Sequence, residues 1–433
     1  MKVCVYGLWH LGSVTAACLA NAGHDVRGLD PSSETIDGLR KGRLPIQEPG
    51  LADLLSAAVA QRRIEFYVDP GEAIKSCQVL WVTFDTPVDD DDRADTQYVM
   101  DRVKEVLPYL QDGALVLVSS QLPGGSCRAL EQFAVDEGHR KISFACSPEN
   151  LRLGKALEVF RNPDRVIVGV RTAADRRVIE ELLAPITDRV EWMSVESAET
   201  TKHAVNAFLA LSVTFANEVA SICEKAGADA KEVERGLKTE SRIGARAYVS
   251  PGTAFAGGTL ARDIAFLNQV GDDGGLQSPL LYAVKVSNDN HRQWPRRKIN
   301  EVVGDLGGAT VCVWGLTYKP GTDTLRRSSS IELCRWLIDQ DVAVRAHDPA
   351  VKQLPDDLSA ITLFPTPEEA AQSSDALIVM TGWPEYQKIN IESILPRMNR
   401  PNVIDPARIL PSAVAGLPTI KYFAVGTAGV TAR

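Results

Sequence analysis

Val3-Cys-Val-Tyr-Gly-Leu-Trp-His-Leu-Gly12 opens the chain with a short apolar run that ends in a glycine turn. A helical pattern follows from Ser13 to Ala22. A second apolar run, Asp25-Val-Arg-Gly-Leu-Asp30, then ends in an acid. Strand, glycine turn, helix, strand and acid in this order predict a βαβ unit.

Further strand-like runs lie downstream of this unit. They cover Val79–Thr83, Ala114–Val118 and Val166–Val170, and helical patterns separate them. Short apolar strands that alternate with helices predict an α/β fold with a doubly wound, mainly parallel sheet.

The middle of the chain has a different pattern. Ser197–Ala226 carries no strand signal, and Gly227 supplies a stop for a helix of about 45 Å. Its apolar positions follow helical spacing and comprise Phe208, Leu211, Phe215 and Ile222. We expect this helix to connect two domains or to form a dimer seam.

The last third repeats the first. Val311-Cys-Val-Trp-Gly-Leu316 is similar to Val3–Leu8, and Asp341–Pro349 is similar to Asp25–Pro31. The repeat predicts two Rossmann-like doubly wound domains, joined by a long central helix with a small helical middle domain. The expected boundaries are residues 1–195, 196–298 and 299–433.

Composition narrows the function classes. The 433 residues are 45% hydrophobic with a net charge of −9, which disfavours nucleic acid or an anionic membrane as partner. No apolar run approaches the roughly 20 residues that span a bilayer, and the start lacks a signal-peptide pattern. We therefore expect a cytoplasmic protein.

Metal-binding patterns are weak in this sequence. The eight cysteines form no CxxC pair and the six histidines form no HxxxH. The acidic run Asp89–Asp92 follows a proline, and such runs are usually solvated. We predict no metal site.

Several strings in the chain occur in order at the spacing of one known family. They are Leu44–Leu51 (LPIQEPGL), Ser147–Arg152 (SPENLR), Asn162–Arg165 (NPDR), Ser197–Phe208, Ser241–Gly244 (SRIG), Pro251–Asp263 (PGTAFAGGTLARD) and Tyr318–Asp323 (YKPGTD). Through them the chain resembles, nearly end to end, the UDP-glucose/GDP-mannose 6-dehydrogenase family. The resemblance implies a dinucleotide-type first domain and a nucleotide-sugar-binding last domain.

The resemblance implies NAD as a possible cofactor. The implied cofactor residues are Gly7, Trp9, Gly12, Asp30, Thr86 and Arg326. Trp9 occupies the middle glycine position of the family's GxGxxG turn, where the backbone approaches the pyrophosphate. We therefore expect weakened or atypical NAD binding.

The resemblance also implies a nucleotide-sugar site. Its catalytic candidates are Glu149, Lys202, Asn206, Asp263 and Thr259, and its substrate-binding candidates are Arg242, Phe255 and Lys319. Lys202 and Asn206 are four residues apart and share a helix face. Arg242 matches a family arginine that reaches the neighbouring subunit's sugar, so we expect a homodimer with Arg242 acting in trans.

Three departures from the family bear on its second oxidation step, in which a cysteine turns the aldehyde into a thioester. Thr259 stands at the position of that cysteine in the family's FGGSCxPKD motif. Gln121 replaces a threonine that helps to hold the catalytic water, and Leu153 replaces an acid. A threonine hydroxyl is far less acidic than a thiol, which closes the thioester route.

These departures favour an enzyme that isomerises a nucleotide sugar without net oxidation, as an epimerase or a pyranose/furanose mutase. The spacing before Phe255 favours a GDP-hexose as substrate. The alternatives are an NAD-dependent nucleotide-sugar 6-dehydrogenase and a non-catalytic nucleotide-sugar-binding protein.

Simpler structural roles remain open for individual residues. Lys202 and Asn206 could form a solvated helix face, and Glu149 could cap the next helix. Trp9 could fill a core slot beside a shifted turn. His203 is adjacent to Lys202 and therefore points elsewhere on a helix, so packing is its expected role.

Overall fold

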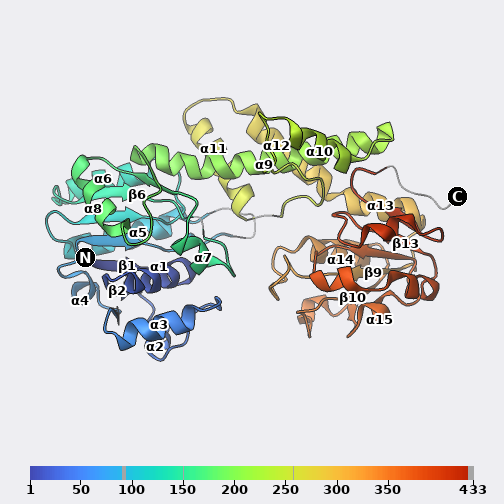
Figure 1. The fold of residues 1–433 in the computed structure, drawn as a ribbon, viewed down its shortest axis with the longest axis horizontal. Coiled ribbons are helices and arrows are strands. Elements are labelled where there is room, and N and C mark those ends of the chain that lie inside the picture. Colours follow the sequence, from blue (N-terminus) through green and yellow to red (C-terminus); the bar gives the residue numbers. More distant parts are fainter. Residues whose placement is uncertain (90–93, 150, 257, 428–433) are drawn as a thin grey trace. The chain divides into compact units, whose positions relative to one another are not determined.

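The computed structural model describes residues 1–89, 94–149, 151–256 and 258–427. The chain forms two compact units. Unit 1 comprises Met1–Val205 with Asp272–Gly274, and unit 2 comprises Asn206–Gly271 with Gly275–Arg433. The colour in Figure 1 follows the chain from blue in unit 1 to red at the end of unit 2.

Unit 1 is built on an eight-stranded sheet in the order β3-β2-β1-β4-β5-β6-β7-β8. The paired strands are parallel except for β6 and β7, which pair antiparallel. The strands are β1 (Lys2–Tyr6), β2 (Asp25–Leu29), β3 (Ile64–Tyr67), β4 (Val79–Val82), β5 (Leu115–Val118), β6 (Ser143–Cys146), β7 (Val166–Gly169) and β8 (Val190–Met193).

Helices cover both faces of this sheet. They are α1 (His10–Asn21), α2 (Ser33–Arg40), α3 (Leu51–Ala60), α4 (Pro70–Ile74), α5 (Thr96–Val106), η1 (Leu107–Tyr109), α6 (Ser126–Asp136), α7 (Ala156–Arg161) and α8 (Ala173–Leu183). Because side chains alternate along a strand, Val3 and Val5 of β1 join one core and Cys4 and Tyr6 join the other. Unit 1 is therefore a three-layer α/β domain.

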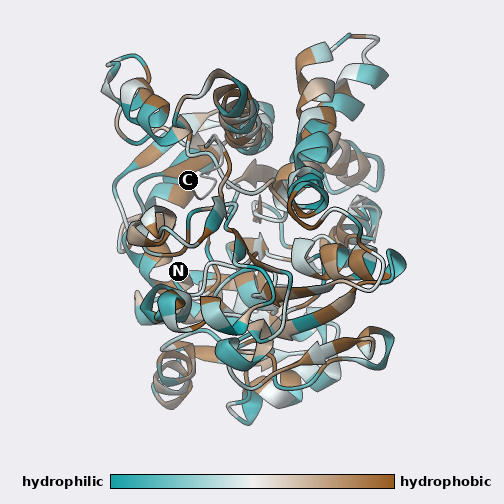
Figure 2. Ribbon diagram, turned by 90° about the vertical axis from the view of Figure 1, so that its right-hand side faces the viewer, coloured by the Kyte–Doolittle hydropathy of each residue, from teal (hydrophilic) through white to brown (hydrophobic). Residues whose placement is uncertain are grey.

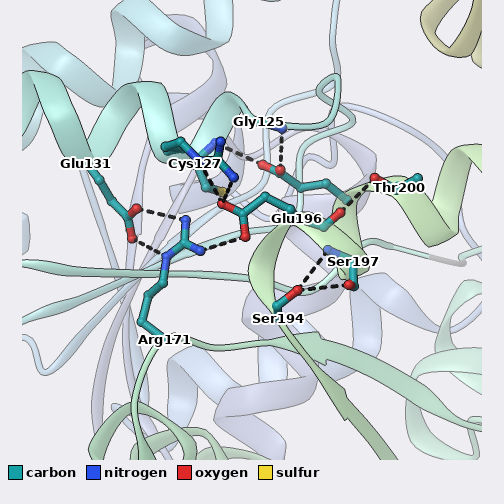
Figure 3. A network of polar contacts seen from close by, with 10 residues as sticks. Gly125, Cys127, Glu131, Arg171, Ser194, Glu196, Ser197 and Thr200 are labelled. Atoms are coloured by element: carbon teal, nitrogen blue, oxygen red, sulfur yellow. Dashed lines mark hydrogen bonds and ion pairs between the residues drawn. The ribbon is translucent and has the colours of Figure 1, made fainter. Parts of the chain in front are cut away.

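The helix α9 (Val195–Ala226) has 32 residues and contributes to both units. A network of ion pairs holds its first turn in unit 1 (Figure 3). Arg171 donates two hydrogen bonds of 2.8 Å to Glu131 and one of 2.7 Å to Glu196 of α9. One turn further along, the buried Glu199 accepts the N–H groups of Gly125 and Cys127 and so caps α6.

Unit 2 contains a helical part and a second sheet. The helices that follow α9 are α10 (Ala230–Thr239), α11 (Thr259–Asp273), α12 (Pro279–Arg292) and α13 (Trp294–Val303). The six-stranded sheet is parallel throughout, in the order β11-β10-β9-β12-β13-β14. Its strands are β9 (Thr310–Trp314), β10 (Ala343–His347), β11 (Ile361–Leu363), β12 (Ala376–Val379), β13 (Asn402–Ile404) and β14 (Lys421–Phe423).

Two α-helices and several 3-10 turns flank the second sheet. They are α14 (Ser329–Asp339), α15 (Pro367–Ala371), η2 (Asp356–Leu358), η3 (Pro384–Lys388), η4 (Ile391–Ser393), η5 (Leu395–Arg397) and η6 (Ser412–Gly416). Brown apolar residues and teal polar residues share the same helices in Figure 2, as expected where one helix side packs on a core.

The helix α9 also exposes large apolar side chains. Phe208 is 67% exposed, Phe215 48% and Ile222 66%, and they repeat at intervals of seven residues. Within the described residues, α9 is the single helix long and apolar enough to cross a bilayer, so our expectation that no apolar run approached that length was wrong. Core helices of soluble proteins pass the same test, and one such helix is weak evidence for a membrane.

The predicted α/β fold with two Rossmann-like parallel sheets is confirmed. The structure differs in detail, since α1 begins at His10 rather than Ser13, directly after the glycine turn. Sequence patterns missed β3, β6 and β8, each of which includes a polar residue, whereas the equally short β4, β5 and β7 are continuous apolar runs and were recognised. The three-domain boundaries stay predictions.

Candidate active site

The site in unit 1 lies at the carboxyl edge of its sheet. The order of strands reverses between β1 and β4, and α/β sheets bind ligands at such a switch point. Gly7 follows β1, Thr83 follows β4 and Ser119 follows β5 at this edge.

The turn after β1 requires glycine at two positions. Gly7 has φ +97°, and a Cβ atom there would lie 2.8 Å from the Phe84 ring. A Cβ on Gly12 would lie 1.8 Å from the carbonyl oxygen of Gly7, so the helix approaches the strand too closely for any side chain. The turn therefore delivers the chain tightly into the N-terminus of α1.

Asp30 lies beside this turn at the end of β2. Its carboxylate accepts the N–H of Leu8 at 2.8 Å and the N–H of Ser32 at 2.9 Å. A carboxylate has about four acceptor positions, so Asp30 keeps capacity for two further donors. A ribose diol supplies such donors.

Trp9 is the N-cap residue of α1 and is 51% exposed. The indole therefore does not fill a position in the hydrophobic core. The first N–H groups of α1 lie outside the intrahelical ladder and face the same edge. The turn, the helix terminus and Asp30 together fit a dinucleotide.

The other strand ends add polar groups. The Thr86 hydroxyl donates to the carbonyl oxygen of Gln121 at 2.6 Å, and the Thr83 hydroxyl donates to that of Gly7 at 2.8 Å. Ser120 is buried, and its hydroxyl has no hydrogen-bond partner among the described residues. It lines a cavity of about 10 Å³ with Lys202, which is room for one water molecule.

Glu149 and Lys202 meet in unit 1. The Lys202 ammonium donates to the carbonyl oxygen of Glu149 at 2.5 Å and lies 3.9 Å from its carboxylate. That carboxylate accepts the N–H of Leu151 at 2.7 Å, so Glu149 also organises its own loop. His203 lies against the carbonyl oxygen of Leu122 at 2.7 Å and is 2% exposed, which agrees with a packing role.

Asn206 and Asp263 meet in unit 2. The Asn206 amide of α9 donates to the Asp263 carboxylate of α11, which is fully buried. Thr259 begins α11 one turn before Asp263 and is exposed.

Three buried side chains that sequence analysis missed hold the loop before α11. Asn288 of α12 accepts the N–H of Phe255 at 3.0 Å and donates to its carbonyl oxygen at 2.9 Å. Asn217 of α9 accepts the N–H of Gly252 at 2.9 Å, and His291 contacts the carbonyl oxygen of Gly252 at 2.7 Å. Burial lowers the pKa of His291, so the ring is neutral and donates one hydrogen bond. The sequence signal that could have identified these residues is a polar side chain on the apolar side of a predicted helix.

A larger cavity of about 320 Å³ lies within unit 2, beside this loop. Its wall includes Met380, Pro406 and Val425, which follow β12, β13 and β14, so it opens at the carboxyl edge of the second sheet. The basic residues in the wall are Lys285, Arg292 and Arg296, and the acidic ones are Asp289 and Glu332.

The remaining predicted residues are exposed. Arg242 pairs with Glu240 at 2.9 Å and its side chain is 86% exposed. Lys319 and Arg326 lie on the exposed loop between β9 and α14. The described residues contain no group of three or more metal-ligating side chains, and Asp90–Asp92 of the acidic run lie outside them.

The fold and the glycine turn define a Rossmann-type dinucleotide-binding protein. Comparison with known families is more specific. The chain matches the UDP-glucose/GDP-mannose dehydrogenase family in its NAD binding domain (residues 1–187), its central domain (196–290) and its UDP binding domain (312–412). The chain belongs to this family.

Individual relatives cover nearly the whole chain. A UDP-glucose 6-dehydrogenase of Pseudomonas aeruginosa is 32% identical over 94% of this chain and 93% of its own length. The UDP-glucose 6-dehydrogenase TuaD of Bacillus subtilis is 31% identical over 93% of this chain and 88% of its own length. The solved structure of a UDP-glucose dehydrogenase from Pyrobaculum islandicum superimposes with a TM-score of 0.85 at 29% identity, over 99% of this chain and 98% of that one.

These relatives overturn the isomerase hypothesis. They are named dehydrogenases, not epimerases or mutases, and the C-terminal match is to a UDP binding domain rather than a GDP site. Our reasoning failed because Thr259, Gln121 and Leu153 concern the second oxidation step alone. The family residues that they replace do not take part in the first hydride transfer. Their absence therefore gave no ground for excluding oxidation.

Proposed function

We propose that this protein is an NAD-dependent nucleotide-sugar dehydrogenase that oxidises the sugar's primary alcohol. The observation that carries the proposal is the turn at Gly7, which joins the α1 N-terminus to the carboxylate of Asp30 at the switch point of the sheet. The family membership and the names of the relatives support the same class of reaction.

Different residues of unit 1 would hold different parts of the cofactor. The N–H groups at the α1 N-terminus would hold the pyrophosphate of NAD, and Asp30 would accept from its adenosine ribose. Thr86 and the unpartnered Ser120 lie at the same edge of the sheet and would be available to the rest of the cofactor. NAD, when bound, supplies the hydride acceptor.

The cavity in unit 2 is our candidate for the nucleotide of the substrate. Its apolar floor suits a base and a ribose, and its three basic residues exceed its two acidic ones. Lys319 lies on the exposed loop that leads into α14, whose first residue, Ser329, lines the cavity. Lys319 supplies a further cation for the diphosphate. A uridine nucleotide agrees with the described domain match.

Each unit contains one pair of residues that is a candidate for proton handling. The Lys202 ammonium can exchange the Glu149 carbonyl oxygen for a sugar oxygen and so stabilise negative charge on it. The Asp263 carboxylate orients the Asn206 amide, which keeps one N–H for the substrate. Glu149 is the carboxylate that can accept the proton from the alcohol.

The extent of oxidation is set by the absence of a thiol in the α11 loop. All eight cysteines are buried, and Thr259 has no thiolate chemistry to offer. A second hydride can leave only from a tetrahedral adduct of the aldehyde, and without the thiol the enzyme does not form the covalent adduct. We therefore expect one NADH per sugar, with the aldehyde as the released product.

The test is to incubate the purified protein with NAD and a panel of UDP- and GDP-hexoses that includes UDP-glucose. NADH is followed by absorbance and the products by NMR and mass spectrometry. We expect one NADH per sugar and a product lighter by two hydrogens. No NADH with any sugar would contradict the dehydrogenase proposal, and two NADH with a uronate would contradict the role given to Thr259.

Trp9 is expected to weaken NAD binding, because its side chain stands where the family turn presents bare backbone. Trp9→Gly should tighten NAD binding about tenfold, or roughly 1.4 kcal/mol, in titration calorimetry. Trp192→Phe, which changes a tryptophan on β8, is the matched control and should leave the affinity unchanged. Equal affinities for the wild type and Trp9→Gly would mean that the turn has adapted to the indole.

We further propose a cytoplasmic homodimer, with the exposed apolar positions of α9 at the interface and Arg242 serving the partner's site. A stable interface of this kind buries about 2,000 Å² or more. Arg242→Ala should lower turnover in mixtures with an active-site variant, whereas exposed Arg246→Ala should not. A monomer in sedimentation that still turns over substrate would contradict the role in trans.

A further inference from the structure

Glu48 is a buried carboxylate that joins two parts of unit 1. Its side chain is 1% exposed and lies in the segment between α2 and α3. It accepts the N–H of Gly154 at 2.8 Å and the N–H of Ala156 at 2.9 Å. It also contacts the His10 ring nitrogen Nε2 at 3.0 Å. No part of the proposed reaction uses Glu48 directly.

The three donors come from both halves of the proposed site. His10 is the first residue of α1, directly after the glycine turn that faces the pyrophosphate. Ala156 is the first residue of α7, and Gly154 lies two residues before it, after Glu149 in the chain. The helices α1 and α7 pack against each other, so the carboxylate bridges neighbouring helix N-termini.

The arrangement favours an ionised carboxylate. Burial by itself would raise the pKa of Glu48, but the hydrogen bonds from Gly154, His10 and Ala156 outweigh it and lower the pKa below its usual value. A buried carboxylate that loses one of its donors has no water to replace it. The position of each donor is therefore tied to that of the others through Glu48.

We propose that Glu48 is a positioning residue that couples the dinucleotide turn to the Glu149 loop, and that His10 is its link to the turn. This inference rests on the proposed function, because it assigns NAD to the turn and Glu149 to the sugar. Moving Glu48 should therefore weaken NAD binding and slow turnover together, although Glu48 touches neither ligand.

Glu48→Gln tests the coupling. The amide offers one acceptor oxygen and one donor group, so one of the three N–H donors would face another donor. We expect NAD affinity and kcat to fall about tenfold each. Asp53→Asn is the matched control, since Asp53 is an exposed carboxylate on α3 and should leave both unchanged.

Variants of His10 separate positioning from folding, because they leave the bonds of Glu48 to α7 in place. Gln carries an N–H donor that reaches as far as the His Nε2, so His10→Gln should keep the NAD affinity within about twofold. His10→Phe lacks the donor and should lose affinity about fivefold. The double variant Glu48→Gln, His10→Phe should be no worse than Glu48→Gln alone, because both act through one contact.

The outcomes distinguish the two proposals. A wild type that neither binds NAD nor reduces it would remove the proposed function and leave Glu48 as a cap for α7. An active wild type with additive losses in the double variant, or with unchanged kinetics in Glu48→Gln and lowered thermal stability only, would overturn the coupling.

Discussion

The two parallel sheets contain the same local motif with different outcomes. In unit 1, Gly7-Leu8 follows β1, and Asp30 after β2 accepts the N–H of Leu8. In unit 2, Gly315-Leu316 follows β9, and Asp348 after β10 accepts the N–H of Leu316 at 2.7 Å.

The acids differ in how many further donors they hold. Asp30 accepts one more hydrogen bond, from Ser32, whereas Asp348 also accepts from Thr317, Ala350, Val351 and the Trp383 indole. The helices differ as well, since α1 starts directly after its turn while a long loop separates Gly315 from α14.

The difference assigns separate tasks to the repeated motif. Unit 1 keeps acceptor capacity and a helix N-terminus at the same place, which a dinucleotide needs. Unit 2 fills its acid with internal bonds, so the motif there serves to fix the loop that carries Lys319 and Arg326.

Substitution of the two glycines should have the largest effect. Gly7→Val forces a side chain into a φ of +97° against Phe84, and we expect NAD affinity to fall about a hundredfold with lowered thermal stability. Gly315→Val meets Thr381 at 2.5 Å and should lower stability comparably. Calorimetric titration of the folded fraction of Gly315→Val with NAD should give the wild-type affinity. A loss of NAD affinity there would end the separation of tasks.

Substitution of the two acids should have an intermediate effect with opposite signatures. Asp30→Asn should weaken NAD binding about tenfold, because a ribose hydroxyl loses a charged acceptor, and should lower stability less than Asp348→Asn, because Asp30 has fewer internal donors. Asp348→Asn should leave NAD binding intact and lower the free energy of unfolding by about 2 kcal/mol, because its amide group faces donors. Urea unfolding and NAD titration of both variants measure the contrast, and similar profiles would contradict it.

The smallest effect concerns acid stability. Hydrogen bonds from Arg171 hold the pKa of Glu196 at about 2, against an ordinary 4.5. A pKa that is depressed in the folded state stabilises the fold above the unfolded value, and this contribution disappears as the pH falls from 4.5 toward 2. Arg171→Gln should therefore flatten the fall of unfolding free energy across that window. Arg335→Gln, whose partner Asp357 is exposed, should reproduce the wild-type slope in the same urea titrations.

In unit 2, Glu234 provides the counterpart of Glu196. Burial would raise its pKa, but hydrogen bonds from Lys238, Ser250 and Lys231 bring it to about 2. Lys238→Gln should flatten the same acid window with a smaller change, because Lys231 and Ser250 remain. A larger change than that of Arg171→Gln would reverse the ranking of the two networks.

The sequence predicted features that depend on neighbours along the chain. The turn at Gly7, the acid at Asp30 and the repeat at Gly315 all follow from short local patterns. It did not predict Glu48 with Gly154, or Asn288 with Phe255, because these contacts join segments far apart in the chain. The isomerase hypothesis failed for another reason. The absence of the family's cysteine at position 259 shows which step the site does not support, but it does not show which reaction the remaining residues perform.

Because every cysteine is buried, thiol labelling can report when each part of the molecule opens. Burial raises the pKa of Cys18 and Cys77 to about 11 and that of Cys334 to about 12, and a protonated, enclosed thiol does not react with alkylating reagents. Each thiol should therefore label only when the segment around it opens. Unit 1 contains Cys4, Cys18, Cys77, Cys127 and Cys146, and unit 2 contains Cys223, Cys312 and Cys334. Mass spectrometry of the labelled peptides would therefore time the opening of each unit separately.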